Sequence, residues 1–328
     1  MTNLKGSDKE LFFNKGYLIK ENIISNQSID RIKNGLQETI IKIIRIVIKN
    51  RQEVDYYMSL PFETCLSELY EKNIEAAQLV LKNIRAGNYR GEAMLEAIRN
   101  PNLVNFLTNF LGKNITASSI YRVRPKIPNY PRGEVPWHQD AGYQLPHCDK
   151  KLVITCWIPL VESTIENGCL WVAPNMHKEG ILEHFTGGPA GFLEIPRKLI
   201  TTQPIPVEIK AGSVLFMTQL TPHASFRNYS KSIRWSLDIR YQDFEVPSNV
   251  GFEPNSYFKN REEVNMACSP GEAYIVVKDS SDQNNEMKDP EEFAELKMDW
   301  GNCIKKMYNP SVRWKSKQSL NYYLNLLT

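Results

Sequence analysis

The first third of the chain carries hydrophobic residues at helical spacing. Apolar residues stand at positions 29, 32, 36, 40, 43 and 47, at steps of three and four residues. Such a stripe predicts an amphipathic helix that packs on a core, with Ser25 or Ser28 as its N-cap. Further helices are predicted at 61–86, 91–98 and 102–111, the last ended by Gly112, and a short strand is predicted within 12–20. Residues 1–112 are therefore expected to form a mainly helical flank.

From residue 113 to about 245 the pattern changes to short alternating segments separated by turn residues. Strands are predicted from residue 115 onwards and at 120–124, 152–158, 169–172, 207–209, 214–217 and 233–241. Gly168 and Gly212 lie in turns between them. Several short strands without intervening helices are typical of an antiparallel sandwich or jelly roll. The expected fold class is mainly β with flanking helices.

Two long segments interrupt this pattern within what we predict to be a single domain, 1–328. Residues 175–203 are rich in glycine and proline and show no period, as is typical of lids and binding loops, so they are expected at the substrate entrance. Residues 246–328 form a C-terminal extension with a helix predicted at about 289–307. This extension could wrap over the barrel or form a dimer contact, and both a monomer and a homodimer remain open.

Composition and charge favour a small-molecule partner. The chain has 328 residues, 42% of them hydrophobic and 23% charged, with a formal net charge of +3. These values are ordinary for a globular protein, and the small charge gives no sign of nucleic-acid or membrane binding. The six cysteines form no CxxC pair, which favours free, buried thiols. The amino terminus lacks an apolar signal-like run and residues 40–48 are too few to cross a bilayer, so a cytoplasmic location is expected.

The candidate chemistry lies at His138, Asp140, His223 and Arg234. His138 and Asp140 are two residues apart, so in an extended segment both side chains leave the same face. His223, after a predicted strand, would supply a third ligand. Two histidines and one carboxylate are the facial set that binds non-haem Fe(II) and leaves positions open for a co-substrate and O2. Arg234, in the next strand, offers a rigid fork for a carboxylate, so the set predicts an iron and 2-oxoglutarate site.

The remaining histidines are assigned other roles or none. His177 is chemically capable of binding metal, but a loop-bracing hydrogen bond is the preferred interpretation, and His147 and His184 are given no role. No GxSxG motif occurs, which removes the commonest serine-hydrolase interpretation. Two alternatives to an oxygenase stay open at this point: a zinc hydrolase that uses the same ligands, and a non-catalytic metal- or ligand-binding barrel.

Around these residues the sequence resembles the phytanoyl-CoA dioxygenase family of Fe(II)/2-oxoglutarate-dependent oxygenases. The resemblance implies a cupin-like double-stranded β-helix with helices packed outside it. It also implies that His138, Asp140 and His223 bind the metal, that Arg234 and Ser225 hold the distal carboxylate of 2-oxoglutarate, and that Trp157 and Tyr121 make further contacts with this co-substrate. The chain departs from the family's Pro-Gly-Ser-His pattern at 174–177. The matching stretches are 12–19, 135–143, 157–160, 166–174, 221–225 and Arg234.

The expected substrate is a small, carboxylate-bearing metabolite, amino-acid-derived or specialised, as in natural product biosynthesis. Its unactivated C–H bond would be hydroxylated, desaturated or closed into a ring, for example in a kainoid-type cyclisation, while 2-oxoglutarate becomes succinate and CO2. Asp140 disfavours halogenation, because related halogenases carry a small residue there, and hydroxylation of an acyl-CoA is the alternative. The alternative for the basic residues among the candidates is that they are solvated charges at the rim of the barrel and do not contact the substrate. The candidate substrate contacts are Arg122, Arg124, Lys126, Arg132, Gln139 and Tyr143.

Overall fold

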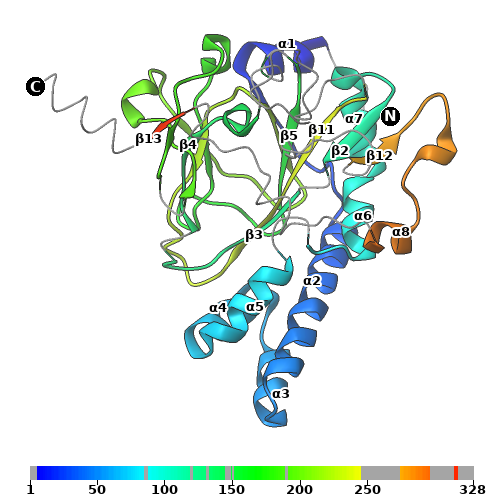
Figure 1. The fold of residues 1–328 in the computed structure, drawn as a ribbon, viewed down its shortest axis with the longest axis vertical. Helices are drawn as coiled ribbons and strands as arrows, with labels where there is room; N and C mark the ends of the chain where they lie inside the picture. Colours follow the sequence, from blue (N-terminus) through cyan, green and yellow to red (C-terminus); the bar gives the residue numbers. More distant parts are fainter. Residues whose placement is uncertain are drawn as a thin grey trace, which may run out of the picture.

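Two antiparallel sheets form the centre of the computed structural model, which describes residues 6–84, 88–118, 121–130, 133–144, 149, 151–188, 191–244, 274–295 and 314–316 (Figure 1). The large sheet has the order β1 (Tyr17–Lys20), β9 (Val214–Thr218), β5 (Ile154–Pro159), β11 (Arg234–Asp243), β2 (Ile115–Ser118) and β12 (Tyr274–Lys278), and β3 (Arg122–Lys126) also pairs with β11. The small sheet has the order β4 (Val135–His138), β10 (His223–Ser225), β6 (Leu170–Val172) and β8 (Ile205–Val207). A short parallel pair joins β7 (Phe185–Thr186) to β13 (Lys315–Ser316).

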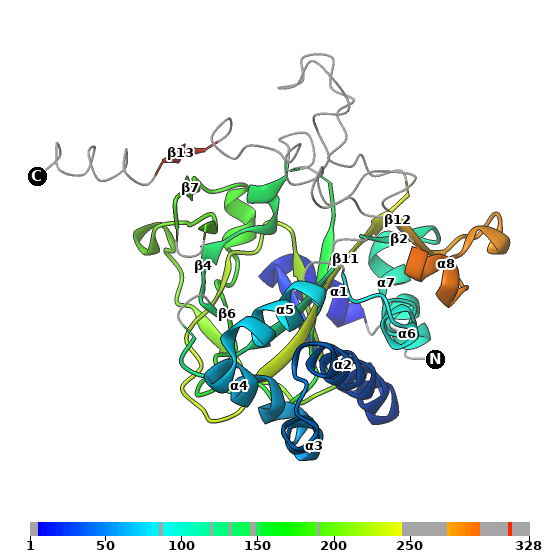
Figure 2. The same cartoon turned by 60° about the horizontal axis from the view of Figure 1, so that its bottom comes forward.

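Helices cover one face of the large sheet. In Figure 2, β4 and β6 of the small sheet lie on the left, α6 and α7 lie on the right, and β11 runs between them. The helices are α1 (Gly6–Lys15), α2 (Asn26–Val47), α3 (Arg51–Ser59), α4 (Phe62–Lys72), α5 (Ile74–Ile84), α6 (Glu92–Ile98), α7 (Pro101–Leu111) and α8 (Pro290–Glu295). None of the described helices is long and apolar enough to cross a membrane.

The alternation of β5 and β11 divides the interior into two parts. Cys156 and Ile239 belong to the main hydrophobic core, which the large sheet shares with α2 and the other helices. Trp157 belongs instead to a second cluster with Leu170, Val207 and Met217, which come from both sheets. Because neighbouring residues of a strand point to opposite faces, one set fills the core while the other faces the small sheet. Thr155 of β5 and Arg234 and Arg240 of β11 have the same parity in their strands as this second set.

The predicted elements are largely confirmed. The stripe of α2 is buried at positions 29, 32, 36, 40 and 43, whereas Val47, the last residue of the helix, is 37% exposed. The N-cap of α2 is Ser25, whose hydroxyl accepts a hydrogen bond of 3.2 Å from the backbone N–H of Ser28. The helices predicted at 91–98 and 102–111 are α6 and α7, and the strands predicted between 115 and 241 correspond to β2, β3, β5, β6, β8, β9 and β11. Three cysteines within the described ranges, Cys65, Cys156 and Cys169, are free and buried, as predicted.

Several boundaries were predicted wrongly. The segment from residue 12 begins as helix: Phe12 is buried in the core from α1, and Gly16, at φ +84°, ends that helix before β1 starts. The helix predicted at 61–86 is two helices, because Asn73 breaks it and its side chain caps the next one at Ala76 N–H. Helix α3 and strands β7, β10, β12 and β13 were not predicted. Of the helix predicted at 289–307, α8 covers 290–295, and residues 296–307 lie outside the described ranges.

Candidate metal centre and co-substrate pocket

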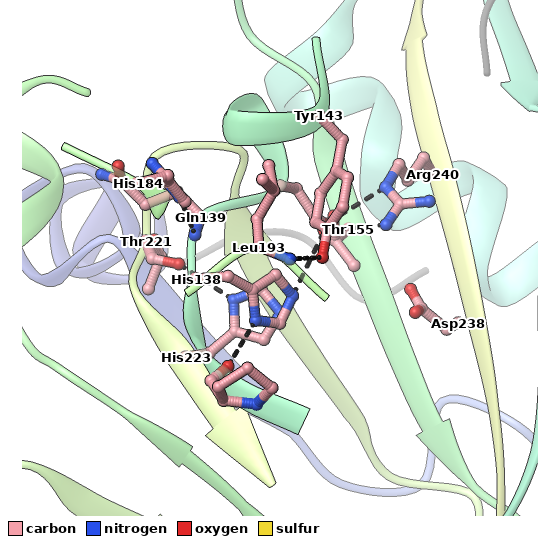
Figure 3. Close-up of polar contacts among 12 residues, drawn as sticks. His138, Gln139, Tyr143, Thr155, His184, Leu193, Thr221, His223, Asp238 and Arg240 are labelled. Carbon is pink, nitrogen blue, oxygen red and sulfur yellow. Dashed lines mark hydrogen bonds and ion pairs between the residues drawn. The ribbon is translucent and has the colours of Figure 1, made fainter. Parts of the chain in front are cut away.

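Two histidines face each other across neighbouring strands of the small sheet. His138 ends β4 and is the direct partner of His223 at the start of β10, with 4.2 Å between the ring centroids (Figure 3). The Nδ1 atom of His138 lies 2.9 Å from the carbonyl of Pro136, and that of His223 lies 3.0 Å from the carbonyl of Thr221. A carbonyl only accepts, so Nδ1 carries the proton and Nε2 keeps its lone pair. Burial, reinforced by His223, lowers the pKa of His138 to about 3, so this imidazole is neutral.

Asp140 follows the strand as the first residue of a 3₁₀ turn, Asp140–Tyr143. Two residues of the large sheet hold its carboxylate. Arg240 donates from Nη2 to Oδ1 at 2.7 Å and from Nε to Oδ2 at 3.1 Å, and the Thr155 hydroxyl also donates to Oδ2. Burial opposes ionisation of this carboxyl group, but the adjacent Arg240 guanidinium keeps the pKa of Asp140 below its ordinary value. The carboxylate is therefore charged.

The three side chains meet at one point. The ligand atoms of His138, Asp140 and His223 all lie within 4.8 Å of one another and all three residues are buried. His138 Nε2 is 3.9 Å from Asp140 Oδ1. Among the residues that the structure describes, this is the one cluster of histidine, cysteine and acidic side chains with metal-binding geometry. Two neutral imidazole nitrogens and one carboxylate oxygen fit divalent iron.

A cavity of about 420 Å³ opens beside the two histidines. Its wall draws on both sheets and on the segment predicted as a lid, which contributes Phe192. Ligand sites of this size hold small molecules that are largely enclosed. The lining residues are Arg122, Val123, Arg124, Pro125, Lys126, Tyr130, Gly133, Val135, His138, Trp157, Leu170, Phe192, Met217, His223, Ser225, Arg234 and Asp238.

Arg234 is a buried cation in the wall of this cavity. It is 1% exposed and lies over the Trp157 ring, 5.2 Å from its centroid. Its guanidinium donates to the hydroxyls of Ser236 at 2.6 Å and Ser225 at 3.2 Å and to the carbonyl of Gly168 at 3.1 Å, while Nε is buried without an acceptor. All these acceptors are neutral, and burial, with a contribution from Arg124, lowers the pKa of Arg234 to about 9. A buried guanidinium without a carboxylate fits an anionic ligand such as 2-oxoglutarate.

The basic residues of β3 line the same cavity. Arg124 pairs with Asp238 across the strands, with Nη2 and Nε at 2.8 and 3.1 Å from Oδ2, so Asp238 does not form a salt bridge with Arg234. Lys126 donates to the carbonyls of Gly133, Ser225 and Phe226 at 2.7, 3.2 and 2.7 Å. Arg122 is half-buried in the wall, and its desolvation, with Arg124 nearby, lowers its pKa to about 9.

Three predicted contacts do not line the cavity, although the Tyr143 ring lies 5.9 Å from that of His138. Tyr121 points into the main core, where its hydroxyl donates to the carbonyl of Tyr89, so this placement does not support contact with the co-substrate. Gln139 braces two loops through the carbonyls of Gly180 and Leu220, and the Tyr143 hydroxyl accepts from Leu193 N–H at 3.0 Å. Neither is among the lining residues. Arg132 and His147 lie outside the described residues.

The other two described histidines have structural roles. His177 Nε2 lies 2.9 Å from the carbonyl of Phe13, which confirms the predicted loop-bracing hydrogen bond. His184, which was given no role, accepts a hydrogen bond of 3.0 Å at Nε2 from the backbone N–H of Gln139, between the two ligands of the 138–140 segment. His184 therefore supports the backbone that carries these ligands.

Sequence reasoning missed the residues that hold Asp140. Thr155 and Arg240 are direct partners in the pairing of β5 with β11, so their side chains leave the same face. In β11, positions 234, 236, 238 and 240 are polar and positions 235, 237, 239 and 241 are apolar. This period of two places Asp238 and Arg240 on the same face of β11 as Arg234. The alternation could therefore have identified both residues as part of the site. The cross-strand partner, Thr155, required the strand register.

Comparison with known proteins agrees with this geometry. A family model described as phytanoyl-CoA dioxygenase (PhyH) matches residues 12–236. The phytanoyl-CoA dioxygenase of Arabidopsis thaliana is 33% identical over 116 residues, which cover 33% of this chain and only 38% of that protein. Phytanoyl-CoA dioxygenase domain-containing protein 1 of Danio rerio is 22% identical over 295 residues, covering 80% of this chain and 98% of that protein.

Two solved structures share the fold. The non-heme alpha ketoglutarate dependent carbocyclase SnoK from nogalamycin biosynthesis has a TM-score of 0.54 at 16% identity, covering 84% of this chain and 97% of its own. The apo form of the non-heme monooxygenase ThoJ has a TM-score of 0.53 at 17% identity, covering 83% of both chains. At these identities the similarity establishes the double-stranded β-helix architecture of the cupin-like oxygenases.

Proposed function

The chain belongs to the phytanoyl-CoA dioxygenase family of iron- and 2-oxoglutarate-dependent dioxygenases, and from this premise we propose that it oxidises a C–H bond of a small, carboxylate-bearing metabolite. The metabolite is amino-acid-derived or specialised, and the oxidation is a hydroxylation, a desaturation or an oxidative ring closure. The observation that carries this proposal is the cavity, in which a candidate metal centre, a buried arginine and a second basic wall lie together.

His138, Asp140 and His223 would hold the iron, with Nε2 of each imidazole and an oxygen of the carboxylate as ligands. Bound ferrous iron supplies the activation of O2, which is coupled to the conversion of 2-oxoglutarate to succinate and CO2. Arg234, with the hydroxyl of Ser225, would hold the distal carboxylate of 2-oxoglutarate, and Trp157 would form the wall beside it.

The charge of the wall favours an anionic substrate. Three arginines line the cavity, Arg122, Arg124 and Arg234, against one lining carboxylate, Asp238. The co-substrate would bind to Arg234, and the negative charge of Asp238 offsets the positive charge of Arg124. Arg122 lies in the wall beside Arg124, and a carboxylate of the substrate matches the fork of its guanidinium.

The opposite wall is apolar. Val135 and Leu170 line the cavity from the strands next to the two histidines, and Tyr130 and Phe192 add aromatic surface. A substrate whose carboxylate lies at Arg122 would therefore place a hydrocarbon part against the small sheet, beside the metal ligands. Rigid placement of that part decides which C–H bond is oxidised and with which outcome.

The experiment is succinate formation from 2-oxoglutarate with iron(II) under air, with a metabolite extract as the source of substrate. Mass spectrometry then identifies products that have gained one oxygen or lost two hydrogens. We expect wild type and His177→Ala to form succinate, and Asp140→Ala and His223→Ala to lose it. Oxidation of phytanoyl-CoA in place of any free carboxylate would overturn the proposed substrate class. Turnover without O2 and 2-oxoglutarate would point to a hydrolase, and metal binding without any turnover to a non-catalytic barrel.

The substrate carboxylate is tested separately with Arg122→Met. Because the proposed partner of Arg122 is the substrate, this variant should raise the KM for the substrate at least tenfold and leave the Kd for 2-oxoglutarate within about threefold. An unchanged KM would remove Arg122 from the substrate site.

A further inference from the structure

The carboxylate of Asp140 is held by a pair of residues on the sheet that carries no metal ligand. Thr155 in β5 and Arg240 in β11 are cross-strand partners, and both side chains donate to Asp140. The two histidines are themselves partners across β4 and β10 of the other sheet. The candidate metal centre is thus built from one cross-strand pair in each sheet, with Asp140 in the turn between them.

The division of hydrogen bonds over the two carboxylate oxygens is uneven. Oδ2 receives Nε of Arg240 and the hydroxyl of Thr155, whereas Oδ1 receives Nη2 of Arg240 alone. Oδ1 is also the oxygen that lies 3.9 Å from His138 Nε2. Since a carboxylate oxygen has two lone pairs, Oδ1 keeps one that a metal ion can share with the imidazoles.

Arg240 could affect metal binding in two opposing ways. Its positive charge repels a cation bound to the same carboxylate, so on electrostatic grounds its removal would tighten metal binding. Its two directed hydrogen bonds fix the rotamer of Asp140, so their loss would leave the carboxylate free to turn away from the histidines. Groups that orient a metal ligand in this way typically contribute about 10- to 100-fold to metal affinity.

We propose that Arg240 and Thr155 are positioning residues that fix Asp140 Oδ1 toward His138 and His223, and that this effect outweighs the repulsion between Arg240 and the metal. The inference rests on the metal site proposed above. Arg240 is well suited to the task because it is held within a long strand, β11, and its side chain is only 12% exposed.

The test measures metal affinity in the absence of turnover. Iron(II) is titrated anaerobically into the metal-free protein, and cobalt(II) is titrated as a second ion whose visible spectrum reports coordination. The variants are Arg240→Met, Arg240→Lys and Thr155→Val. Arg124→Met is the matched control, because it removes a guanidinium from the same face but from Asp238 rather than Asp140. Circular dichroism of each metal-free variant checks the fold.

We expect Arg240→Met to raise the Kd for iron about 10- to 100-fold and to change the cobalt spectrum. Thr155→Val should raise the Kd by a smaller factor, and Arg240→Lys should recover part of the loss because a lysine keeps one donor. Arg124→Met should leave the Kd unchanged or lower it. If Arg240→Met and Thr155→Val bind iron as tightly as Arg124→Met does, the positioning role is wrong. If wild type binds no iron, the proposed function itself fails.

If Arg240→Met does not fold, Thr155→Val and Arg240→Lys decide the question. Valine keeps the volume of Thr155, and lysine keeps the positive charge of Arg240. Unchanged affinity and an unchanged cobalt spectrum in both of these variants would overturn the inference.

Discussion

Replacement of Arg234 by methionine should separate ligand binding from stability. In the wild-type protein the guanidinium is 1% exposed, its acceptors are neutral oxygens, and its Nε has no acceptor. A carboxylate of 2-oxoglutarate would supply the missing negative charge. Removal of one partner from a buried ion pair costs about 3–5 kcal/mol, so the Kd for 2-oxoglutarate should rise on the order of 10²- to 10⁴-fold.

The free energy of unfolding without ligand should move in the opposite direction or stay the same. Exchange of a buried charge for an apolar side chain of similar volume is often neutral or stabilising by about 1–4 kcal/mol. Arg234→Met should therefore unfold at the same or a higher temperature than wild type when no ligand is present. A variant that is only misfolded would instead unfold at a lower temperature.

Two measurements test the expected changes in ligand affinity and in thermal stability. Calorimetric titration of 2-oxoglutarate into protein loaded anaerobically with iron(II) gives the Kd. Thermal unfolding with 2-oxoglutarate at 100 times the wild-type Kd should show about 2.7 kcal/mol of stabilisation in wild type and almost none in the variant.

The matched control is Lys126→Met, at the position that pairs with Arg234 across β3 and β11. The Lys126 amino group already binds three carbonyls, so its loss should lower stability and leave the Kd for 2-oxoglutarate within about tenfold. The reasoning is refuted if Arg234→Met binds 2-oxoglutarate within about threefold of wild type, or if Lys126→Met is the weaker binder.

Three further substitutions test the surrounding structure. Gly142→Ala would place Cβ 2.6 Å from His184 Nε2, so it should displace the acceptor of Gln139 N–H and weaken iron binding in the same titration. Leu36→Ala, at a fully buried position of α2, should lower the free energy of unfolding in urea by about 2–5 kcal/mol, whereas Ile46→Ala, 59% exposed on the same helix, should cost less than about 1 kcal/mol. Phe192→Ala should raise the KM for the substrate and leave the Kd for 2-oxoglutarate unchanged, and equal losses in both would contradict its placement at the substrate.

Two of the metal ligands, His138 and Asp140, could be predicted from the sequence because their geometry is local, whereas His223 meets them only through the pairing of β10 with β4. The spacing of His138 and Asp140 is enough to point both side chains to one side, and His223 and Arg234 are the first residues of β10 and β11. The amphipathic stripe of α2 was equally clear because burial of its apolar face dictates the period. At 138–140 and in α2, the residues that the local pattern favours are also the residues that the tertiary structure needs.

The parts that the sequence did not reveal depend on register and on turns. Tyr121 has the opposite parity to Arg122 and Arg124, and it enters the core while they line the cavity. Gln139 and Tyr143 follow a strand that ends at His138, so alternation no longer predicts where their side chains point. The contact of Arg240 with Asp140 joins residues 100 positions apart, and only the pairing of β5 with β11 brings it about.

The central claim is that His138, Asp140 and His223 bind a single ferrous ion. Crystals grown anaerobically with iron(II) and 2-oxoglutarate, measured at the iron absorption edge, test it most directly. We predict one anomalous peak about 2 Å from Nε2 of both histidines and from Asp140 Oδ1, with 2-oxoglutarate reaching from that ion to Arg234. A peak bound by other residues, or no peak between these three side chains, would contradict the account.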